Sequence, residues 1–409
     1  MLKPIKESQR FWWLFTLYGF ACLYVALFCQ IPWKSDSLNY YRFAKDAIAV
    51  HNWFPHVNSI HYDWIAAPLY INILIAALKI FQTPASFYIL AVGFNLAQLY
   101  FIYRLTERFF GAKTALIAAL LYVLYLNNLG LILLNYTELP FGCFTLASLY
   151  FFTNKPRTVH FYWAGLMAGL ALGIRPTIAP LIGLYGLWLV YRWWQERRYP
   201  WLMYGAVLML GVCTYIIPAG TYSKHTLGLF IFTSNTGPAN MVMSTLDNAT
   251  GVYNDTLFKK DPVLLSKKTF VEKNAYLTQR STEWIRKNPV RWLSLWPRKF
   301  KTTFTTDDIA VSSLLGPKWS LNQWKTDRSQ PVDRQLFRKE PFLFRLSFYF
   351  LHVWHELFYL FLTGIWGYQF FYFWKHRHTV PVIVWLLNGF TILGLTLTFV
   401  GSVGMPRYK

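Results

Sequence analysis

The sequence predicts an all-α polytopic membrane protein, and two observations carry this prediction. Apolar stretches of about 18 residues or more, the length that crosses a bilayer as a helix, recur along most of the 409-residue chain. Charged residues make up only 14% of the sequence, whereas soluble domains contain about 25%. The apolar stretches lack the alternation of barrel strands, so helices must satisfy the backbone in lipid.

Nine apolar stretches have the length of membrane spans. The first is too long for a signal-peptide core and has no small-residue cleavage site, so it is predicted to be retained. Residues 65–82 are apolar but short, and Pro68 interrupts them. They are predicted to lie at the interface, because a full span there would place later basic links on the outer side. The predicted spans are residues 11–31, 87–106, 112–131, 137–153, 160–175, 177–193, 201–220, 346–374 and 380–400.

Basic residues cluster in the links between these spans. The chain contains 40 Lys and Arg against 18 Asp and Glu, a formal charge of +22. Because the charges sit in short clusters between apolar runs, they indicate membrane topology and anionic lipid headgroups, and no nucleic-acid partner is expected. The positive-inside rule makes the links cytoplasmic. These links are residues 107–113, 154–160, 192–198 and 375–378.

Changes in polarity divide the chain into three parts. Residues 1–220 are predicted to form an N-terminal transmembrane bundle, which includes a first outer loop at residues 32–86. Residues 221–345 are polar, with Gly and Pro at intervals, and are predicted to form a partly helical extracytoplasmic loop segment. Residues 346–409 supply the C-terminal transmembrane helices.

Two stretches are predicted to be interfacial helices. Residues 36–50 have apolar side chains at helical spacing, namely Leu38, Tyr41, Ala44 and Ile48. Residues 281–304 alternate aromatic and basic side chains, a pattern typical of a helix that lies in the membrane interface.

Two acidic residues at the outer ends of spans are candidate catalytic groups. Asp36 follows the first span and could act as a general base toward an acceptor hydroxyl. It could equally cap the helix that follows. Glu138, between two apolar runs, could orient the acceptor or a cationic partner. Otherwise it is an early-turn acid favoured by the helix dipole, or a loop charge.

Two arginines are candidate phosphate ligands. Arg175 precedes Pro176 between two span-length apolar stretches, and arginine holds phosphate oxygens in a bidentate manner while remaining charged. A fixed cation would stabilise the charge that develops on a departing phosphate. The alternative is an arginine that reaches toward lipid headgroups. Arg407, just after the last span, is either a second phosphate ligand or part of a basic tail.

No cofactor is indicated. The four cysteines lie in apolar runs without a CxxC pair, and no Walker loop, GxGxxG, GxSxG or HExxH motif is present. Three histidines at positions 51, 56 and 61 do not stack on one helix face, so no metal site is predicted, although metal dependence stays open. Asp63 is a lesser candidate with a structural alternative.

In combination, these residues resemble the GT-C glycosyltransferases. The chain is similar to family 39, which includes protein O-mannosyltransferases and lipid A aminoarabinose transferases. One departure is Ser37, which stands where many relatives have a second acid after the Asp. The matching features, in order, are Asp36 with Tyr40 and Ala44, the Ala-Pro-Leu-Tyr stretch at 67–70, the Arg-Phe-Phe-Gly-Ala-Lys stretch at 108–113, Thr137 with Glu138, residues 169–176, 233–237 and 283–297, and Arg407 with Tyr408.

The resemblance implies a GT-C-type bundle and transfer of a sugar, with inversion, from a polyprenyl- or dolichyl-phosphate donor. The expected acceptor is an extracytoplasmic glycan, lipid or protein. The expected location is the bacterial inner membrane, with the active site on the extracytoplasmic side. Carried over, the implied catalytic residues are Asp36 and Glu138, the donor-phosphate ligands are Arg175, Arg407 and Tyr408, and the candidate substrate-lining residues are Tyr40, Tyr62, Asp63 and Tyr70.

Two other classes of function remain open on the sequence. A lipid or solute transporter usually has broken helices and charges near the bilayer midplane, whereas these charges lie at span ends. A non-catalytic membrane partner with a GT-C-like fold is the second alternative, because the partner acid after Asp36 is missing.

Overall fold

The computed structural model describes residues 7–33, 35–53, 66–247, 249–251, 260–305, 310–315, 341–376 and 380–401. Within these ranges the chain forms helices and turns without strands, which confirms the prediction of an all-α polytopic membrane protein. The helices are α1 (Glu7–Phe28), α2 (Ser35–Ala49), α3 (Pro68–Phe81), α4 (Ser86–Leu124), α5 (Asn127–Leu134), α6 (Glu138–Phe152), α7 (Thr158–Ile174), η1 (Pro176–Ile178), α8 (Ala179–Glu196), α9 (Pro200–Leu227), α10 (Gly237–Met243), α12 (Pro262–Ser266), α13 (Phe270–Lys287), α14 (Pro289–Ser294), α15 (Trp296–Thr305), η2 (Val311–Leu315), α17 (Phe342–Lys375) and α18 (Val382–Gly401).

Several helices are long and apolar enough to cross a membrane. Among the described residues these are α1, α4 and α9, and the bent pair α5–α6 would be a fourth span. The shorter apolar helices include α3 and α7. With 14 residues, α3 is only about 21 Å long, less than the ~30 Å hydrocarbon core, which agrees with an interfacial position.

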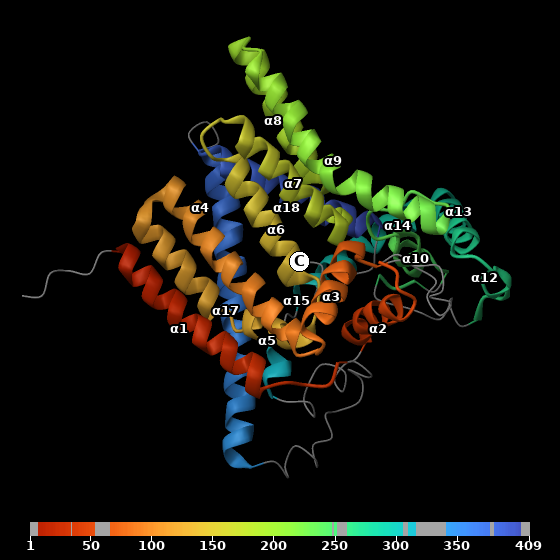
Figure 1. Ribbon diagram of the computed structural model, residues 1–409, viewed down its shortest axis with the longest axis horizontal. Helices are drawn as coiled ribbons and strands as arrows, with labels where there is room; N and C mark the ends of the chain where they lie inside the picture. The colour runs from red at the N-terminus through yellow and green to blue at the C-terminus, as the bar shows by residue number, and fades with distance from the viewer. Residues whose placement is uncertain are drawn as a thin grey trace, which may run out of the picture.

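The bundle is built from neighbouring helices that pack in sequence order. Helix α4 packs against α1 and α6, and α7 lies between α6 and α9 (Figure 1). Helices α7 and α9 approach each other closely, since a Cβ on Gly165 would stand 1.9 Å from the carbonyl oxygen of Leu208. Small residues let helices approach this closely in lipid, where van der Waals packing rather than water exclusion holds them together.

Helix α4 is a helical hairpin. Its helical geometry is broken at Gly111, whose φ of 84° and ψ of 166° are accessible essentially to glycine alone. The Tyr122 hydroxyl donates a 2.6 Å hydrogen bond to Oδ1 of Asn95 across the two halves. The halves are therefore antiparallel, and the predicted link at residues 107–113 is a sharp reversal at one glycine.

The predicted span at residues 112–131 does not continue as one helix. It ends at Leu124, and the chain continues after a short break as α5, which is itself followed by a bend of 118° between α5 and α6. Polar side chains stabilise this break: Asn128 Nδ2 donates to the carbonyl of Tyr122, and Asn127 Oδ1 accepts from the backbone N–H groups of Ala310 and Val311. Hydropathy did not reveal the break between α4 and α5, because α5 itself is apolar.

Helix α2 forms where predicted, with its buried face slightly turned. The most buried apolar side chains are Phe43, Ala44 and Ala47, which pack against α3. Of the four apolar side chains that were predicted to share one face, only Ala44 is fully buried. Leu38, Tyr41 and Ile48 are half-buried. The buried face of α2 is turned because it packs against α3.

The loop segment, defined here as residues 228–305, has a small core of its own. Helices α10 and α13 pack together, and the buried residues are Ala239, Val242, Leu246, Ala249, Leu264, Leu277, Trp284 and Leu295. The prediction of a single interfacial helix over residues 281–304 is wrong. Pro289 ends α13 after Lys287, since proline disfavours helical geometry in the residue before it, and the chain continues as the separate helices α14 and α15.

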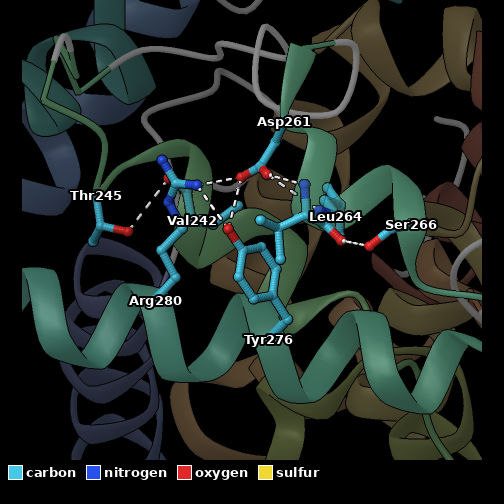
Figure 2. Close-up of polar contacts among 8 residues, drawn as sticks. Val242, Thr245, Asp261, Leu264, Ser266, Tyr276 and Arg280 are labelled. Atoms are coloured by element: carbon cyan, nitrogen blue, oxygen red, sulfur yellow. Dashed lines mark hydrogen bonds and ion pairs between the residues drawn. The ribbon is translucent and has the colours of Figure 1, made fainter.

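A polar cluster joins α12 to α13 within this segment (Figure 2). Asp261 caps α12 through Oδ1, while its Oδ2 accepts a 2.9 Å hydrogen bond from the Tyr276 hydroxyl and pairs with Arg280. Burial alone would raise the pKa of Asp261, but the hydrogen bonds, together with the Arg280 charge, outweigh it and lower this pKa. The carboxylate therefore stays ionised at neutral pH and holds the two helices together.

Candidate active site

The candidate site is built on the corner between α5 and α6. The corner residue Asn135 has φ of 49° and ψ of 47°, the left-handed conformation that asparagine tolerates better than most residues. Its side chain is 2% exposed. The left-handed turn directs the chain from α5 into α6.

The side chain of Asn135 ties this corner to α2 and α3. The Tyr70 hydroxyl donates to Asn135 Oδ1 at 2.5 Å, and Asn135 Nδ2 donates to the carbonyl of Ser37 at 3.3 Å. The Ser37 hydroxyl in turn donates to the carbonyl of Leu134. Three elements that are distant in sequence therefore meet at one buried amide.

Arg175 approaches the same corner from α7. It is followed by Pro176, which favours an extended preceding residue, and Arg175 accordingly ends α7 with φ of −143° and ψ of 131°. Its Nε and Nη2 donate to Thr137 Oγ1 at 2.9 and 2.7 Å, and Nη2 donates to Glu138 Oε1 at 2.6 Å. The guanidinium is thus fixed in position by two consecutive residues at the start of α6.

The ion pair between Arg175 and Glu138 is partly buried. The side chains are 24% and 20% exposed. Glu138 lies in the first turn of α6, where the helix dipole also favours its negative charge. Breaking one partner of such a pair is costly, because the other charge stays in a poorly solvated place.

Both members of the pair keep unused hydrogen-bonding capacity. The second carboxylate oxygen of Glu138, Oε2, is buried and has no hydrogen-bond partner in the described part of the chain. All three hydrogen bonds of Arg175 use Nε and Nη2, so Nη1 has none among the described residues. The cluster can therefore offer N–H donors to an anion and an acceptor to a hydroxyl.

Asp36 lies beside this corner. It belongs to the first turn of α2 and is half-buried, and the next residue, Ser37, contacts both Leu134 and Asn135. The first turn of α2 and the fork of Arg175 therefore meet the same short stretch of chain. Tyr40 and Tyr70 add an aromatic pair with ring centroids 5.4 Å apart.

The structure brings some predicted site residues together and leaves others undescribed. Glu138 and Arg175 are in direct contact, and Asp36, Tyr40 and Tyr70 lie on the elements that Asn135 ties to them. Four predicted residues lie outside the described residues, namely Tyr62, Asp63, Arg407 and Tyr408.

The sequence did not single out two residues that position the site. No structural role was predicted for Asn135, and Thr137 was named only together with Glu138. The available signal was a polar residue that tolerates left-handed geometry. It is isolated between apolar runs and is followed by a charged residue. This signal could not reveal that Asn135 contacts α2 and α3, because those partners are distant in sequence.

One comparison with known proteins found a match. Residues 66–232 match the family model described as dolichyl-phosphate-mannose-protein mannosyltransferase. The resemblance to this family is confirmed. The match indicates a membrane glycosyltransferase of the GT-C type that uses a lipid-linked sugar. No curated protein and no solved structure matches the chain.

The matched range of this mannosyltransferase family covers most of the candidate site. It runs from just before α3 to just after α9 and includes Asn135, Glu138 and Arg175, whereas Asp36 precedes it. The family match and the cluster at the α5–α6 corner therefore concern the same part of the chain.

Proposed function

We propose that the chain transfers a sugar, with inversion, from a polyprenyl- or dolichyl-phosphate donor to an extracytoplasmic acceptor. The observation that carries this proposal is the arginine fork of α7, fixed by Thr137 and Glu138 next to the first turn of α2. A preorganised cation of this kind stabilises the negative charge of a departing phosphate without reorganising during the reaction.

In this mechanism Arg175 holds the donor phosphate through its uncommitted Nη1 donors, and Arg407 and Tyr408 contribute from the last residues of the chain. Asp36 removes the proton from the acceptor hydroxyl, whose oxygen attacks the anomeric carbon. The bond between that carbon and the phosphate oxygen breaks, and the lipid phosphate leaves with the bonding electrons. Glu138 keeps the arginine in place and orients the acceptor.

The test is a transfer assay with the purified chain and a lipid-phosphate sugar. We expect Arg175→Ala to lower kcat/KM by about 100-fold or more, the usual effect of removing one transition-state donor. Arg175→Lys keeps the charge but loses the fork, so it should retain part of the activity. Asp36→Asn should lower kcat by about 100-fold or more, as expected for a general base.

The matched control is Arg157→Ala, which removes an exposed arginine from the loop before α7 and should leave transfer unchanged. Wild-type turnover by Asp36→Asn would remove that residue from the base role. Donor binding without transfer by the unmodified chain would instead identify a non-catalytic partner that has kept the fold.

The proposed membrane orientation places the candidate site on the extracytoplasmic side of the inner membrane. The site forms where α7 ends and α8 is about to begin. The basic link at residues 192–198 lies at the opposite end of α8. The 18 residues of α8 extend about 27 Å, close to the ~30 Å thickness of the hydrocarbon core. The two ends of α8 therefore suit the two membrane surfaces.

A further inference from the structure

A cavity lies at the end of the bundle opposite Arg175. It has a volume of about 600 Å³. It forms where the loop before α7, the last turns of α8 and the start of α9 converge. Its lining residues are Pro156, Trp188, Arg192, Glu196, Arg198 and Trp201.

Arg192 is the central polar residue of this cavity. Its guanidinium carbon lies 4.8 Å from the ring centroid of Trp201 and 5.5 Å from that of Trp188. Nη2 pairs with Glu196, while Nε is buried and has no hydrogen-bond partner in the described structure. The two indoles orient a guanidinium that still has an unsatisfied donor.

The only acid in this lining is already engaged. Glu196 accepts from Arg192 at Oε1 and from the indole N–H of Trp201 at Oε2, the latter at 2.8 Å. The side chain of Arg198 is exposed and makes no ion pair or hydrogen bond within the described ranges. The polar groups that remain uncommitted in the lining are therefore donors on two cations, so the cavity suits an anion.

Helix α8 carries apolar side chains on the side that faces away from the bundle. Leu187, Val190 and Trp194 are all more than half exposed. In a membrane this surface would contact acyl chains, and the indoles would lie at the level of the headgroups. A cavity with uncommitted cationic donors at the level of the headgroups suits the phosphate of a lipid.

We propose that this cavity binds the phosphodiester headgroup of an anionic phospholipid, whose acyl chains stay in the surrounding membrane. Arg192 and Arg198 contact the phosphate, and Trp188 and Trp201, whose rings pack edge to face, form an aromatic wall of the cavity. The site is separate from the candidate active site and lies at the other membrane surface.

The experiment measures lipid retained by the full chain purified in neutral detergent. Phosphatidylglycerol and phosphatidylcholine are supplied in equal amounts, and bound lipid is counted by native mass spectrometry. We expect phosphatidylglycerol to be preferred, and Arg198→Gln to weaken its binding about fivefold, because a basic residue contributes about that factor at an anionic lipid surface. Arg192→Gln combined with Arg198→Gln should abolish the preference.

Two further variants make the test specific. Glu196→Gln removes the only negative charge of the lining, so it should strengthen phosphatidylglycerol binding. The matched control combines Lys113→Gln with Lys375→Gln, which removes two exposed cations that do not line the cavity and that the proposed topology places on the same membrane side. This control should keep the wild-type preference.

Inorganic phosphate supplies the arm that separates a lipid from a free anion. Millimolar phosphate should not displace phosphatidylglycerol, because the acyl chain contributes to binding. Displacement would overturn the assignment to a lipid. Equal losses in the cavity variant and the lysine control, or no loss in Arg198→Gln, would overturn the site. The Arg198 side chain has no partner among the described residues, so its variant remains informative if the Arg192 variant fails to fold.

Discussion

At the residue scale, the arrangement of the candidate site depends on one buried amide. Asn135 holds the hydroxyl of Tyr70 and the backbone of Ser37, and two residues later Thr137 receives the fork of Arg175. A change at Asn135 should therefore affect both the stability of the corner and the position of the arginine.

We expect Asn135→Ala to lower the free energy of unfolding by about 3 kcal/mol. The lost hydrogen bonds leave buried polar groups unsatisfied, and alanine also pays about 1 kcal/mol for the left-handed conformation. Asn135→Gly removes the second cost only, so it should lose about 2 kcal/mol. Thermal and denaturant unfolding in detergent would check the order, and wild-type stability of both variants would contradict it.

The sequence predicted the charged residues of the site but not the contacts between them. A charge at the end of an apolar span is costly, so Glu138 and Arg175 stood out as candidates. Their direct pairing could not be derived, because it depends on how α6 and α7 are placed. Asp36 also stood out, while the Ser37 contact that puts it beside the same corner depends on the left-handed turn at Asn135.

At the scale of elements, the reversal at Gly111 decides how α4 packs. Its two halves lie antiparallel, so the second half returns along the first to reach the α5–α6 corner. A residue with a Cβ at this position would have to adopt a backbone conformation that only glycine enters readily.

Gly111→Ala should therefore lower the free energy of unfolding by about 1–3 kcal/mol. A Cβ at this position meets no atom within 4 Å, so the cost would come from the backbone alone. Gly93→Ala is the matched control, because it also has open space around the added Cβ but lies inside the first half of α4. It should stabilise slightly, and equal effects of the two changes would contradict the explanation.

Hydrophobic length predicted the helices well and their breaks poorly. The stretch from residue 112 to 131 has the composition of a span, yet it is not one helix. Hydrogen bonds of Asn127 and Asn128 stabilise a break between α4 and α5. In the loop segment, the proline at 289 was the visible signal for a break in the predicted interfacial helix. The aromatic pattern around it was interpreted as a surface face, although Trp284 and Leu295 belong to a buried core.

At the scale of the whole molecule, the class of fold follows from composition, while its orientation in the membrane remains a proposal. Basic links and span lengths were sufficient to predict an all-α membrane bundle. The match to the mannosyltransferase family covers α3 to α9. The remaining helices lie outside the matched range, so only their packing relates them to it. Helix α9 also continues to Leu227, beyond the boundary predicted at residue 220.

The orientation can be tested with single cysteines in a background without the four native ones. Arg157→Cys, in the loop before α7, should resist a membrane-impermeant maleimide in intact cells and react after permeabilisation. Lys268→Cys, just before α13, should react in both cases, since both positions are exposed. The opposite pattern would place the candidate active site in the cytoplasm.

The corner residue Asn135 has one further consequence for production of the chain in a eukaryotic host. Asn135, Tyr136 and Thr137 spell an N-glycosylation sequon. In the folded chain the asparagine amide is enclosed and the threonine hydroxyl is bound by Arg175, so neither can enter an oligosaccharyltransferase. A glycan at this position would mark molecules modified before the corner closed, and those molecules could no longer close it.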